Sequence, residues 1–330
     1  MEFKDSQSLF DAFGQLKVLV IGDVMVDSYI WGSVSRISPE APVPVVLAKK
    51  KEKRLGGAAN VALNVQALGA IPIPCAIVGD DIDGQFFLER LQERGIPNKG
   101  VITSSERETT VKERVLAGSH QMIRVDTESD KDMSEMEEKS LLSHIKNLLP
   151  ECHVVIFEDY DKGVINKRVI QTTIEEANRL GIPTVVDPKK RNFMDYKGAT
   201  LFKPNLKELR EGMKLEVDPT DLNSIKTAAK ALQDALDAKM VMVTLSEHGV
   251  FIKDNGDTHL IPAHIRQVSD VSGAGDTVIS VVACALAAGL DAEKTAALSN
   301  LAGGLVCEYV GVVPINKDDL QKEAEERNIF

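Results

Sequence analysis

The amino-acid sequence predicts an α/β protein with three layers, α/β/α, in which helices cover both faces of a central, mostly parallel sheet and a small β lid lies over one end. Short β-branched runs alternate with helical patterns along the 330 residues, which is typical of parallel sheets. Only 5% of the residues are aromatic although 43% are hydrophobic, so aliphatic side chains must fill most of the interior, as in helices packed on a buried sheet. Two segments interrupt the alternation, and they predict the lid.

The strands of the central sheet are predicted from short apolar runs that end at turn residues. These runs are Lys17–Gly22, Ile73–Val78, Val154–Phe157, Pro183–Val186, Thr200–Lys203 and Met240–Leu245. The helical patterns between them are Ala58–Leu68, Phe86–Arg94, Lys167–Leu180 and Leu222–Ala235. Turns that contain glycine, such as the one at Gly181, end a helix and lead into the next strand.

The lid is predicted from residues Tyr29–Ala48 and Thr109–Asp126, which read as strands of a hairpin or edge type. The first segment carries prolines among alternating apolar residues, and proline suits edge strands. These prolines are Pro39, Pro42 and Pro44. We expect residues 1–330 to form a single domain into which the lid, at about 29–48 and 109–126, is inserted.

Charge and cysteine content exclude several classes of function. The net charge is -11, and an acidic protein repels nucleic acid and anionic membranes, so neither is expected as a partner. The four cysteines occur singly, without the paired spacing of a zinc or redox motif, which predicts reduced thiols. The first residues are charged and lack an apolar signal core, so we expect a cytoplasmic protein.

A glycine-rich turn, Ser272-Gly273-Ala274-Gly275, precedes a helix of small and apolar residues. Glycines let the backbone approach a ligand, and the first N–H groups of a helix favour phosphate. Asp276 follows at the helix start, where a carboxylate is often only a favourable helix-terminal charge. Phosphoryl transfer needs a base near the attacking hydroxyl and donors near the phosphate, and this one turn supplies both. Asp276 is therefore the predicted base.

A second glycine pair, Gly56-Gly57, opens another helix of small residues that contains Asn60. Exposed N–H groups beside glycines can approach a polyol, and Asn60 can both donate and accept hydrogen bonds. The alternative is a tight contact between helix and sheet that requires small residues. The motif predicts a sugar site.

Together these motifs resemble the ribokinase-like PfkB carbohydrate kinases over nearly the whole chain, with Asn205-Leu206-Lys207-Glu208 matching the Asn-x-x-Glu motif of that family. The resemblance implies a ribokinase-like fold, ATP as phosphoryl donor and Asp276 as the base. It implies an anion hole at Gly273, Ala274 and Gly275, and Mg²⁺ held through water by Asn205 and Glu208, in keeping with the oxygen ligands that this ion prefers. Asp27 matches the early sugar-binding acid of the family. Asp23 ranks below Asp27 for this role, because its alternative is a turn residue at a strand end.

The nucleotide side of the site is also inferred from the resemblance. The turn after Met240–Leu245 matches the one that passes the nucleotide phosphates, and a later helix of small residues matches the adenine-side helix. The implied cofactor-binding residues are Asn205, Glu208, Thr244, Ser246, Gly249, Ser272, Gly273, Gly275 and Asn300. For Gly303 and Gly304 on that helix, close packing of the helix is an equal alternative to a role in nucleotide binding.

Within the family the sequence is most similar to the D-glycero-D-manno-heptose 7-phosphate kinases. The segments that carry this similarity are Gly22–Tyr29, Ser35–Val46, Asp159–Gly163 and Val186–Lys189. The resemblance implies phosphorylation of the anomeric C1 hydroxyl to the 1,7-bisphosphate, a step toward ADP-heptose for lipopolysaccharide core, and a homodimer that forms through lid strands. No His-x-Gly-His motif occurs, so we expect a stand-alone kinase and a separate nucleotidyltransferase downstream.

A phosphorylated substrate requires cations in the site. Candidate residues alternate in the predicted lid strands or follow predicted strand ends, where ligands collect in open α/β sheets. With Asp159, which the resemblance adds, the predicted substrate contacts are Asp27, Gly56, Gly57, Asn60, Lys112, Arg114, Arg124, Asp159, Lys162 and Lys189. A plain surface charge is the alternative for each basic residue taken alone. Other sugar kinases, acting on fructose 1-phosphate, tagatose 6-phosphate or ribose, and a non-catalytic sugar or nucleotide sensor are the alternative functions.

Overall fold

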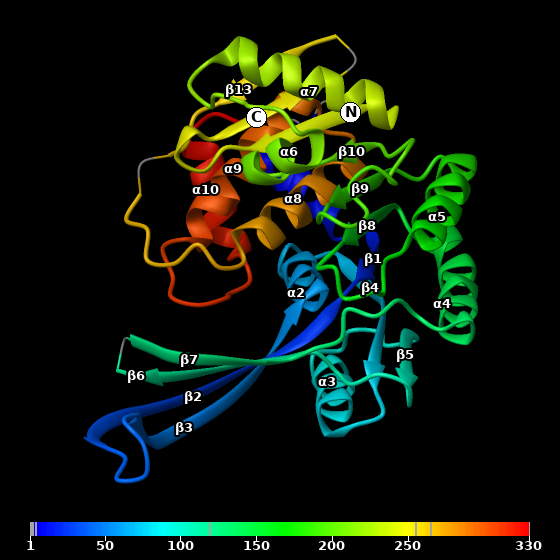
Figure 1. The fold of residues 1–330 in the computed structure, drawn as a ribbon. Coiled ribbons are helices and arrows are strands. Elements are labelled where there is room, and N and C mark those ends of the chain that lie inside the picture. The colour runs from blue at the N-terminus through cyan, green and yellow to red at the C-terminus, as the bar shows by residue number, and fades with distance from the viewer. Residues whose placement is uncertain (1–2, 4, 119, 255, 265, 330) are drawn as a thin grey trace.

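The central sheet of the protein is built from nine of the strands that the structure describes. A computed structural model describes residues 3, 5–118, 120–254, 256–264 and 266–329 (Figure 1). The strands lie in the order β13-β12-β11-β10-β9-β8-β1-β4-β5, and all neighbours pair in parallel except at the β11-β12-β13 edge. Their bounds are β1 Lys17–Gly22, β4 Ile71–Gly79, β5 Gly100–Ser104, β8 Val154–Glu158, β9 Thr184–Asp187, β10 Leu201–Phe202, β11 Met240–Thr244, β12 Val250–Lys253 and β13 Thr258–Ile261.

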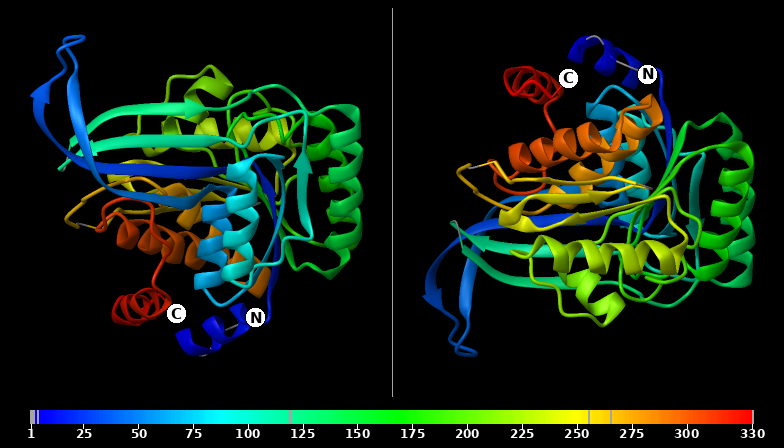
Figure 2. Two further views of the ribbon diagram at one scale, coloured as in Figure 1. Left: turned by 90° about the horizontal axis from the view of Figure 1, so that it is seen from below. Right: turned by 90° about the horizontal axis from the view of Figure 1, so that it is seen from above.

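Helices cover both faces of this sheet, as the two views of Figure 2 show. One face carries α1 Ser6–Phe13, α2 Ala58–Ala67, α3 Ile82–Glu93, α8 Ala274–Ala288, α9 Ala292–Val306 and α10 Lys317–Glu326. The other face carries α4 Glu135–Leu148, α5 Lys167–Leu180, α6 Leu206–Met213 and α7 Leu222–Leu236. Two short 3₁₀ helices, Leu149–Glu151 and Ser246–His248, lie in connections. This arrangement confirms the predicted three-layer α/β/α class.

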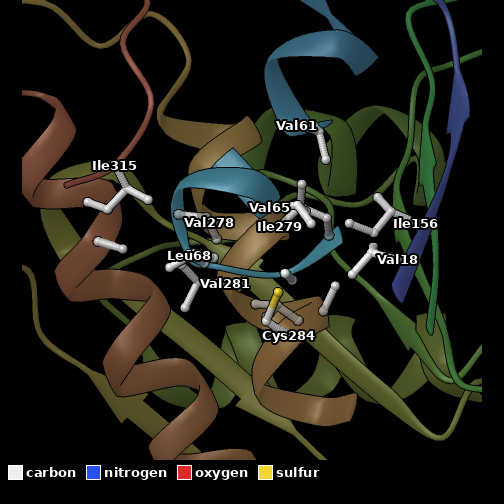
Figure 3. Close-up of a cluster of buried hydrophobic side chains, with 14 of the residues drawn as sticks. Val18, Val61, Val65, Leu68, Ile156, Val278, Ile279, Val281, Cys284 and Ile315 are labelled. Carbon is white, nitrogen blue, oxygen red and sulfur yellow. The ribbon is translucent and has the colours of Figure 1, made fainter. Parts of the chain in front are cut away.

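The hydrophobic core has two halves because side chains of a strand point alternately to the two faces of its sheet. In β1, Val18 and Val20 belong to the cluster beneath α2 and α8, whereas Leu19 and Ile21 belong to the cluster beneath α4 and α5. Figure 3 shows the first cluster, in which Ile156 of β8 lies among side chains of α2 and α8. The interior is mostly aliphatic, as the composition predicted.

Every predicted strand and helix is present, with ends that differ by a few residues. The sequence analysis did not identify the strands β5, β12 and β13 or the helices α1, α6 and α10. The edge strands β5 and β13 are half exposed, so their apolar runs are short, and β12 has only four residues. The helix α10 is mostly polar, with only Leu320 and Ala324 buried. In the described residues, α1 packs beside α10, which brings the two ends of the chain together (Figure 2).

A second sheet extends from the body, and it contains the predicted lid segments (Figure 1). Among the described residues it has four strands in the order β3-β2-β6-β7. Their bounds are β2 Val24–Ile37, β3 Pro44–Gly57, β6 Val111–Ala117 and β7 His120–Thr127. The strand β3 therefore continues well beyond the predicted end at Ala48. Its second half is rich in Lys and Glu and has no apolar alternation, because β3 is an edge strand and charged edges prevent unwanted pairing.

No helix within the described ranges is both long and apolar enough to cross a membrane.

Candidate active site

The site is centred on the N-terminus of α8, which lies at the carboxyl ends of β8 and β9. Gly273, the N-cap residue, has a left-handed backbone with φ of 81°, and a Cβ there would lie 3.1 Å from Asn60 Nδ2 and from Val312 Cγ1. Only glycine suits this position. Within the described residues, the N–H groups of Gly275 and Asp276 donate no hydrogen bond to the chain. They are available to an anion at the positive end of the helix.

A cavity of about 570 Å³ opens beside this helix end. It brings together predicted residues from three separate segments, because Thr244, Ser246, Gly249, Ala274, Gly275 and Asn300 all line it. Gly303 and Gly304 also line the cavity, so they do not serve only to pack one helix on another. Ser272 and Asn205 do not line it, and the side-chain amide of Asn300 donates to the Pro262 carbonyl oxygen at 2.9 Å.

The sequence analysis missed one wall of this cavity, formed by Ala263, His264, Arg266 and Val268. Arg266, His264 and Val268 line the cavity, and Arg266 pairs with Glu308 and Glu323. These residues show neither helical nor strand periodicity and carry no motif, so the sequence offered no signal for them.

Asp276 is buried on the other side of the same helix end, and each oxygen of its carboxylate has a donor. Asn60 Nδ2 donates to Oδ2 at 2.6 Å, and the Tyr160 hydroxyl donates to Oδ1 at 2.9 Å. Burial raises the pKa of Asp276 from 3.8 to about 6, while these two hydrogen bonds lower it and the nearby Asp187 carboxylate raises it further. Asp276 is thus a carboxylate with a pKa close to neutral, as a general base requires.

Two more carboxylates lie under Asp276 at the strand ends. Glu158 ends β8 and pairs in register with Asp187, which ends β9, and Asp187 forms a buried ion pair with Lys203 at 2.8 Å. Glu158 Oε2 is buried and has no hydrogen-bond partner among the described residues. Burial, with the charges of Asp187 and Asp276, raises the pKa of Glu158 well above its usual value. Lys203 and Glu158 were not predicted as site residues.

The predicted sugar side faces the same region. Gly56 and Gly57 end β3, and a Cβ on Gly56 would overlap the Asp27 carboxylate while one on Gly57 would overlap the Asp23 carbonyl oxygen. Asp27 is buried and is paired with Arg114. Asn60 Oδ1 is also buried without a partner among the described residues, so an acceptor remains free beside Asp276. The structure therefore brings these glycines, Asp27 and Asn60 to one place.

The strand register separates the side chains of the second sheet into two faces. Asp27 pairs with Arg54 and Lys112, and Tyr29 pairs with Glu52 and Arg114. All six side chains share one face, and the Tyr29 ring lies 5.1 Å from the Arg54 guanidinium and 5.3 Å from that of Arg114. Arg124, opposite Arg114 in β7, lies on this face as well. Arg54 was missed although it stands two residues before Gly56, since the run Lys49–Arg54 reads as a solvated strand.

Each predicted cation already has an acidic neighbour. Lys112 contacts Asp126 and Glu128, Arg124 contacts Asp126, and Lys162 contacts Glu128. These pairs are partly exposed, so they are weak, and a phosphate could compete for the cations.

Asn205 and Glu208 form a capping box at the start of α6. Asn205 Oδ1 accepts from the Glu208 N–H at 2.8 Å, and Glu208 Oε2 accepts from the Asn205 N–H at 2.9 Å. Glu208 Oε1 contacts Lys189 Nζ at 2.8 Å. Both oxygens of the carboxylate therefore already have protein donors. Oxygen donors are the right type for Mg²⁺, and the remaining lone pairs suit a contact through water better than direct ligation.

Asp159 and Asp23 hold the turn after β8 in place. Asp159 is buried, and its oxygens accept from the Asp161 N–H, Asn192 Nδ2 and the Tyr196 hydroxyl. These contacts assign Asp159 to the turn, so we no longer place it among the sugar contacts. Asp23 accepts from the N–H groups of Tyr160, Lys162 and Val164, in agreement with the alternative that it is a turn residue.

Comparison with known proteins identifies a family and several relatives. Residues 15–319 match the family described as pfkB family carbohydrate kinase. The chain is 42% identical over 294 residues, 89% of its length, to the bifunctional protein HldE of Wolinella succinogenes. It is 42% identical over 317 residues, 94% of its length, to the protein of the same description from Magnetococcus marinus. It spans 61% and 64% of the lengths of these two relatives.

Solved structures are similar in fold. Phosphofructokinase-2 from Escherichia coli, described as its tetrameric inhibited form, has a TM-score of 0.77 at 20% identity, with 95% of this chain and 99% of that chain covered. Ribokinase from Arabidopsis thaliana, complexed with ribose and ATP, has a TM-score of 0.72 at 18% identity, with 93% and 99% covered. These likenesses confirm the ribokinase-like fold.

Proposed function

Because the chain belongs to the pfkB family of carbohydrate kinases, we propose that it transfers a phosphoryl group from ATP to the anomeric C1 hydroxyl of D-glycero-β-D-manno-heptose 7-phosphate. The enzyme is a sugar kinase, and kinases of this family use ATP with Mg²⁺. The proposal concerns the acceptor and the roles of individual residues.

One observation carries the proposal, namely the position of Asp276 between the cavity beside the start of α8 and the predicted sugar side. On one side, Gly275 lines the cavity beside the free N–H groups of α8. On the other side, Asp276 contacts Asn60, whose Oδ1 has no hydrogen-bond partner among the residues that the structure describes. A phosphate bound at the helix end and a hydroxyl bound at Asn60 would thus meet at the carboxylate. Asp276 would take the proton of the hydroxyl as the oxygen attacks the γ-phosphorus of ATP, and the bond from this phosphorus to the ADP oxygen would break, so that ADP leaves.

The cavity and the capping box fit the two expected cofactors. The cavity has an apolar wall that includes Val250 and Val278 for a nucleobase and the helix end for phosphates. Asn205 and Glu208 would hold Mg²⁺ through water, and the bound ion supplies charge neutralisation of the phosphates.

The basic face of the second sheet supports a phosphorylated acceptor. Arg54 and Lys112 lie in register with Asp27, the proposed ligand of the sugar hydroxyls, and Arg114 forms an ion pair with Asp27. A guanidinium can bind a phosphate through two parallel hydrogen bonds, and Arg54 and Arg114 are held against the Tyr29 ring. We expect the 7-phosphate to lie on this face.

The acceptor is tested by incubating the protein with Mg²⁺-ATP and a panel of sugars. The panel contains heptose 7-phosphate, fructose 1-phosphate, tagatose 6-phosphate and ribose, and ADP release gives the rate for each. Phosphorus NMR of the product then identifies the phosphorylated position. Fastest turnover of the heptose phosphate, with a new signal at C1, is the expected result. Preference for another sugar would replace the acceptor and leave the kinase assignment intact.

We also propose that the second sheet acts as a lid and as a dimer interface. Its face opposite Asp27 exposes Val34, Ile123 and Val125, which are 38%, 56% and 49% exposed, and a second copy would cover them. The double substitution Ile123→Glu with Val125→Glu should shift the particle mass measured by light scattering toward the monomer. A wild-type protein that is monomeric at assay concentration would exclude the dimer.

The product would be consumed by a nucleotidyltransferase on the route to ADP-heptose, since the relatives with 42% identity are bifunctional proteins. We expect this chemistry in the cytoplasm, where the reaction has access to ATP.

A further inference from the structure

Tyr160 is the residue that connects the predicted base to the turn after β8. Its hydroxyl donates to Asp276 Oδ1 across 2.9 Å, although 116 positions separate the two residues in the chain. Asn60 donates to the other oxygen, so the carboxylate is held at both ends. A carboxylate with one fixed donor at each oxygen has a single orientation and presents its remaining lone pairs in fixed directions.

The turn that carries Tyr160 is built to hold this side chain in place. The Tyr160 N–H donates to Asp23 Oδ2 at 2.9 Å, and the same aspartate accepts from the N–H groups of Lys162 and Val164. Gly163 has a φ of 86°, and a Cβ there would overlap the Lys131 carbonyl oxygen. The backbone is therefore anchored on both sides of Tyr160, so the hydroxyl position is set by the fold.

A cation also contacts the Tyr160 ring. Lys189 Nζ lies 5.6 Å from the ring centroid and 2.8 Å from Glu208 Oε1. A series of contacts thus leads from Asp276 through Tyr160 and Lys189 to the Asn205–Glu208 capping box. This series ties the base to the residues proposed for Mg²⁺, and it restrains the ring as well as the hydroxyl.

The charges around Asp276 give the hydroxyl a chemical task. Carboxyl groups of Glu158 and Asp187 approach the base from β8 and β9, and Lys203 approaches it after β10. Burial and Asp187 favour the protonated form of Asp276, while the donors Asn60 and Tyr160 and the charge of Lys203 favour the ionised form. Removing one donor would leave a buried carboxylate oxygen without a partner, and the protonated form would gain.

We propose that Tyr160 is a positioning residue, whose hydroxyl holds the Asp276 carboxylate ionised and in the orientation that accepts the proton of the sugar hydroxyl. This role rests on the proposed function of Asp276 as the base. It does not depend on which sugar phosphate is the acceptor, since Tyr160 contacts the base and not the sugar-phosphate face.

The substitution Tyr160→Phe removes the hydroxyl and retains the ring. Tyr196→Phe is the matched control, because the Tyr196 hydroxyl donates to another buried carboxylate, that of Asp159, at 2.8 Å. Incorporation of 3-fluorotyrosine at position 160 retains the size of the side chain nearly unchanged and makes the hydroxyl a stronger donor. For each protein, kcat, KM and the pH dependence of kcat/KM are measured with the best acceptor of the wild type, together with the thermal midpoint.

Tyr160→Phe should lower kcat by about 10- to 100-fold and move the acidic limb of the pH profile upward by about one pH unit. The fluorinated residue should move the acidic limb downward. Tyr196→Phe should lower the thermal midpoint and leave the acidic limb in place. An acidic limb that stays in place in both position-160 proteins would overturn the proposal.

A readout without substrate separates this proposal from the choice of acceptor. The side-chain carboxyl of Asp276 is followed by carbon NMR as a function of pH, with Asp276→Asn used to assign the signal. An upward shift of its titration in Tyr160→Phe supports the role of Tyr160 even when the heptose phosphate is not turned over. An unchanged titration excludes it, whatever the acceptor.

Discussion

Replacing Asp276 by Asn should lower kcat by at least about 100-fold and at the same time stabilise the protein above pH 6. The pKa of Asp276 rises from 3.8 to about 6 on folding, chiefly through burial. Such a rise corresponds to about 3 kcal/mol of stability that is lost as the pH increases through this range. The folded wild type holds its proton more tightly than the unfolded chain, so this group favours folding below pH 3.8 and opposes it fully at pH 8.

The neighbourhood of Asp276 can accommodate the amide. Asn60 Nδ2 and the Tyr160 hydroxyl both donate to the carboxylate, so one of them would face the new NH₂ group. Asn60 Oδ1 has no partner in the described part of the chain, and rotation of the Asn60 amide would present this acceptor instead. We therefore expect Asp276→Asn to gain about 1–3 kcal/mol at pH 8 and nothing near pH 4, while kcat falls by at least about 100-fold.

The assay is urea unfolding at both pH values beside the rate of ADP release. Asp270→Asn is the control for the sign of the stability change, because the pKa of Asp270 is lowered on folding. Partial burial raises this pKa, but hydrogen bonds from the backbone N–H groups of Ser272 and Gly311 outweigh that effect. That variant should lose stability at pH 8. If Asp276→Asn were less stable than the wild type at pH 8, or kept its turnover, the assignment of Asp276 as a buried base with a raised pKa would be refuted.

Three further predictions concern the rest of the site. The wild-type kcat/KM should fall as the pH decreases through about 6, because Asp276 becomes protonated, and a pH profile with a flat acidic side would contradict this. Gly56→Ala should raise KM for the sugar more than KM for ATP, since the new Cβ would overlap the Asp27 carboxylate, and steady-state kinetics with each substrate varied measure both. Lys203→Met should destabilise the fold by about 3–5 kcal/mol because it leaves Asp187 buried without its cation, and the urea midpoint would show whether it does.

The order of strands and helices could be predicted because each element carries its own pattern. The run Lys17–Gly22 is β1 without a change of boundary, and Lys167–Leu180 is α5 in the same way. Strands at exposed edges were not predicted correctly. Residues Lys49–Gly57 continue β3, yet their charges face solvent on an edge and give no apolar signal.

Residues of the candidate site that lie in a motif could also be located from the sequence. Gly273, Gly275 and Asp276 are neighbours in the chain, so a single turn defines their geometry. The contacts to Asp276 are of another kind, since Asn60 is 216 positions away and Tyr160 is 116 positions away. Motif reading placed Asn60 in the site through its glycine pair, but it did not assign Tyr160 a role.

Asp276 thus illustrates the division between sequence and tertiary structure. Local patterns in the chain were enough to predict the α/β class and a carboxylate at a glycine-rich helix start, because dihedral preferences and hydrophobic period are local properties. The packed fold was needed to show which donors hold that carboxylate, that Arg54 shares a face with Asp27, and that Asp159 belongs to a turn. These outcomes depend on burial and on hydrogen bonds between distant segments, and such interactions exist only after the segments have packed together.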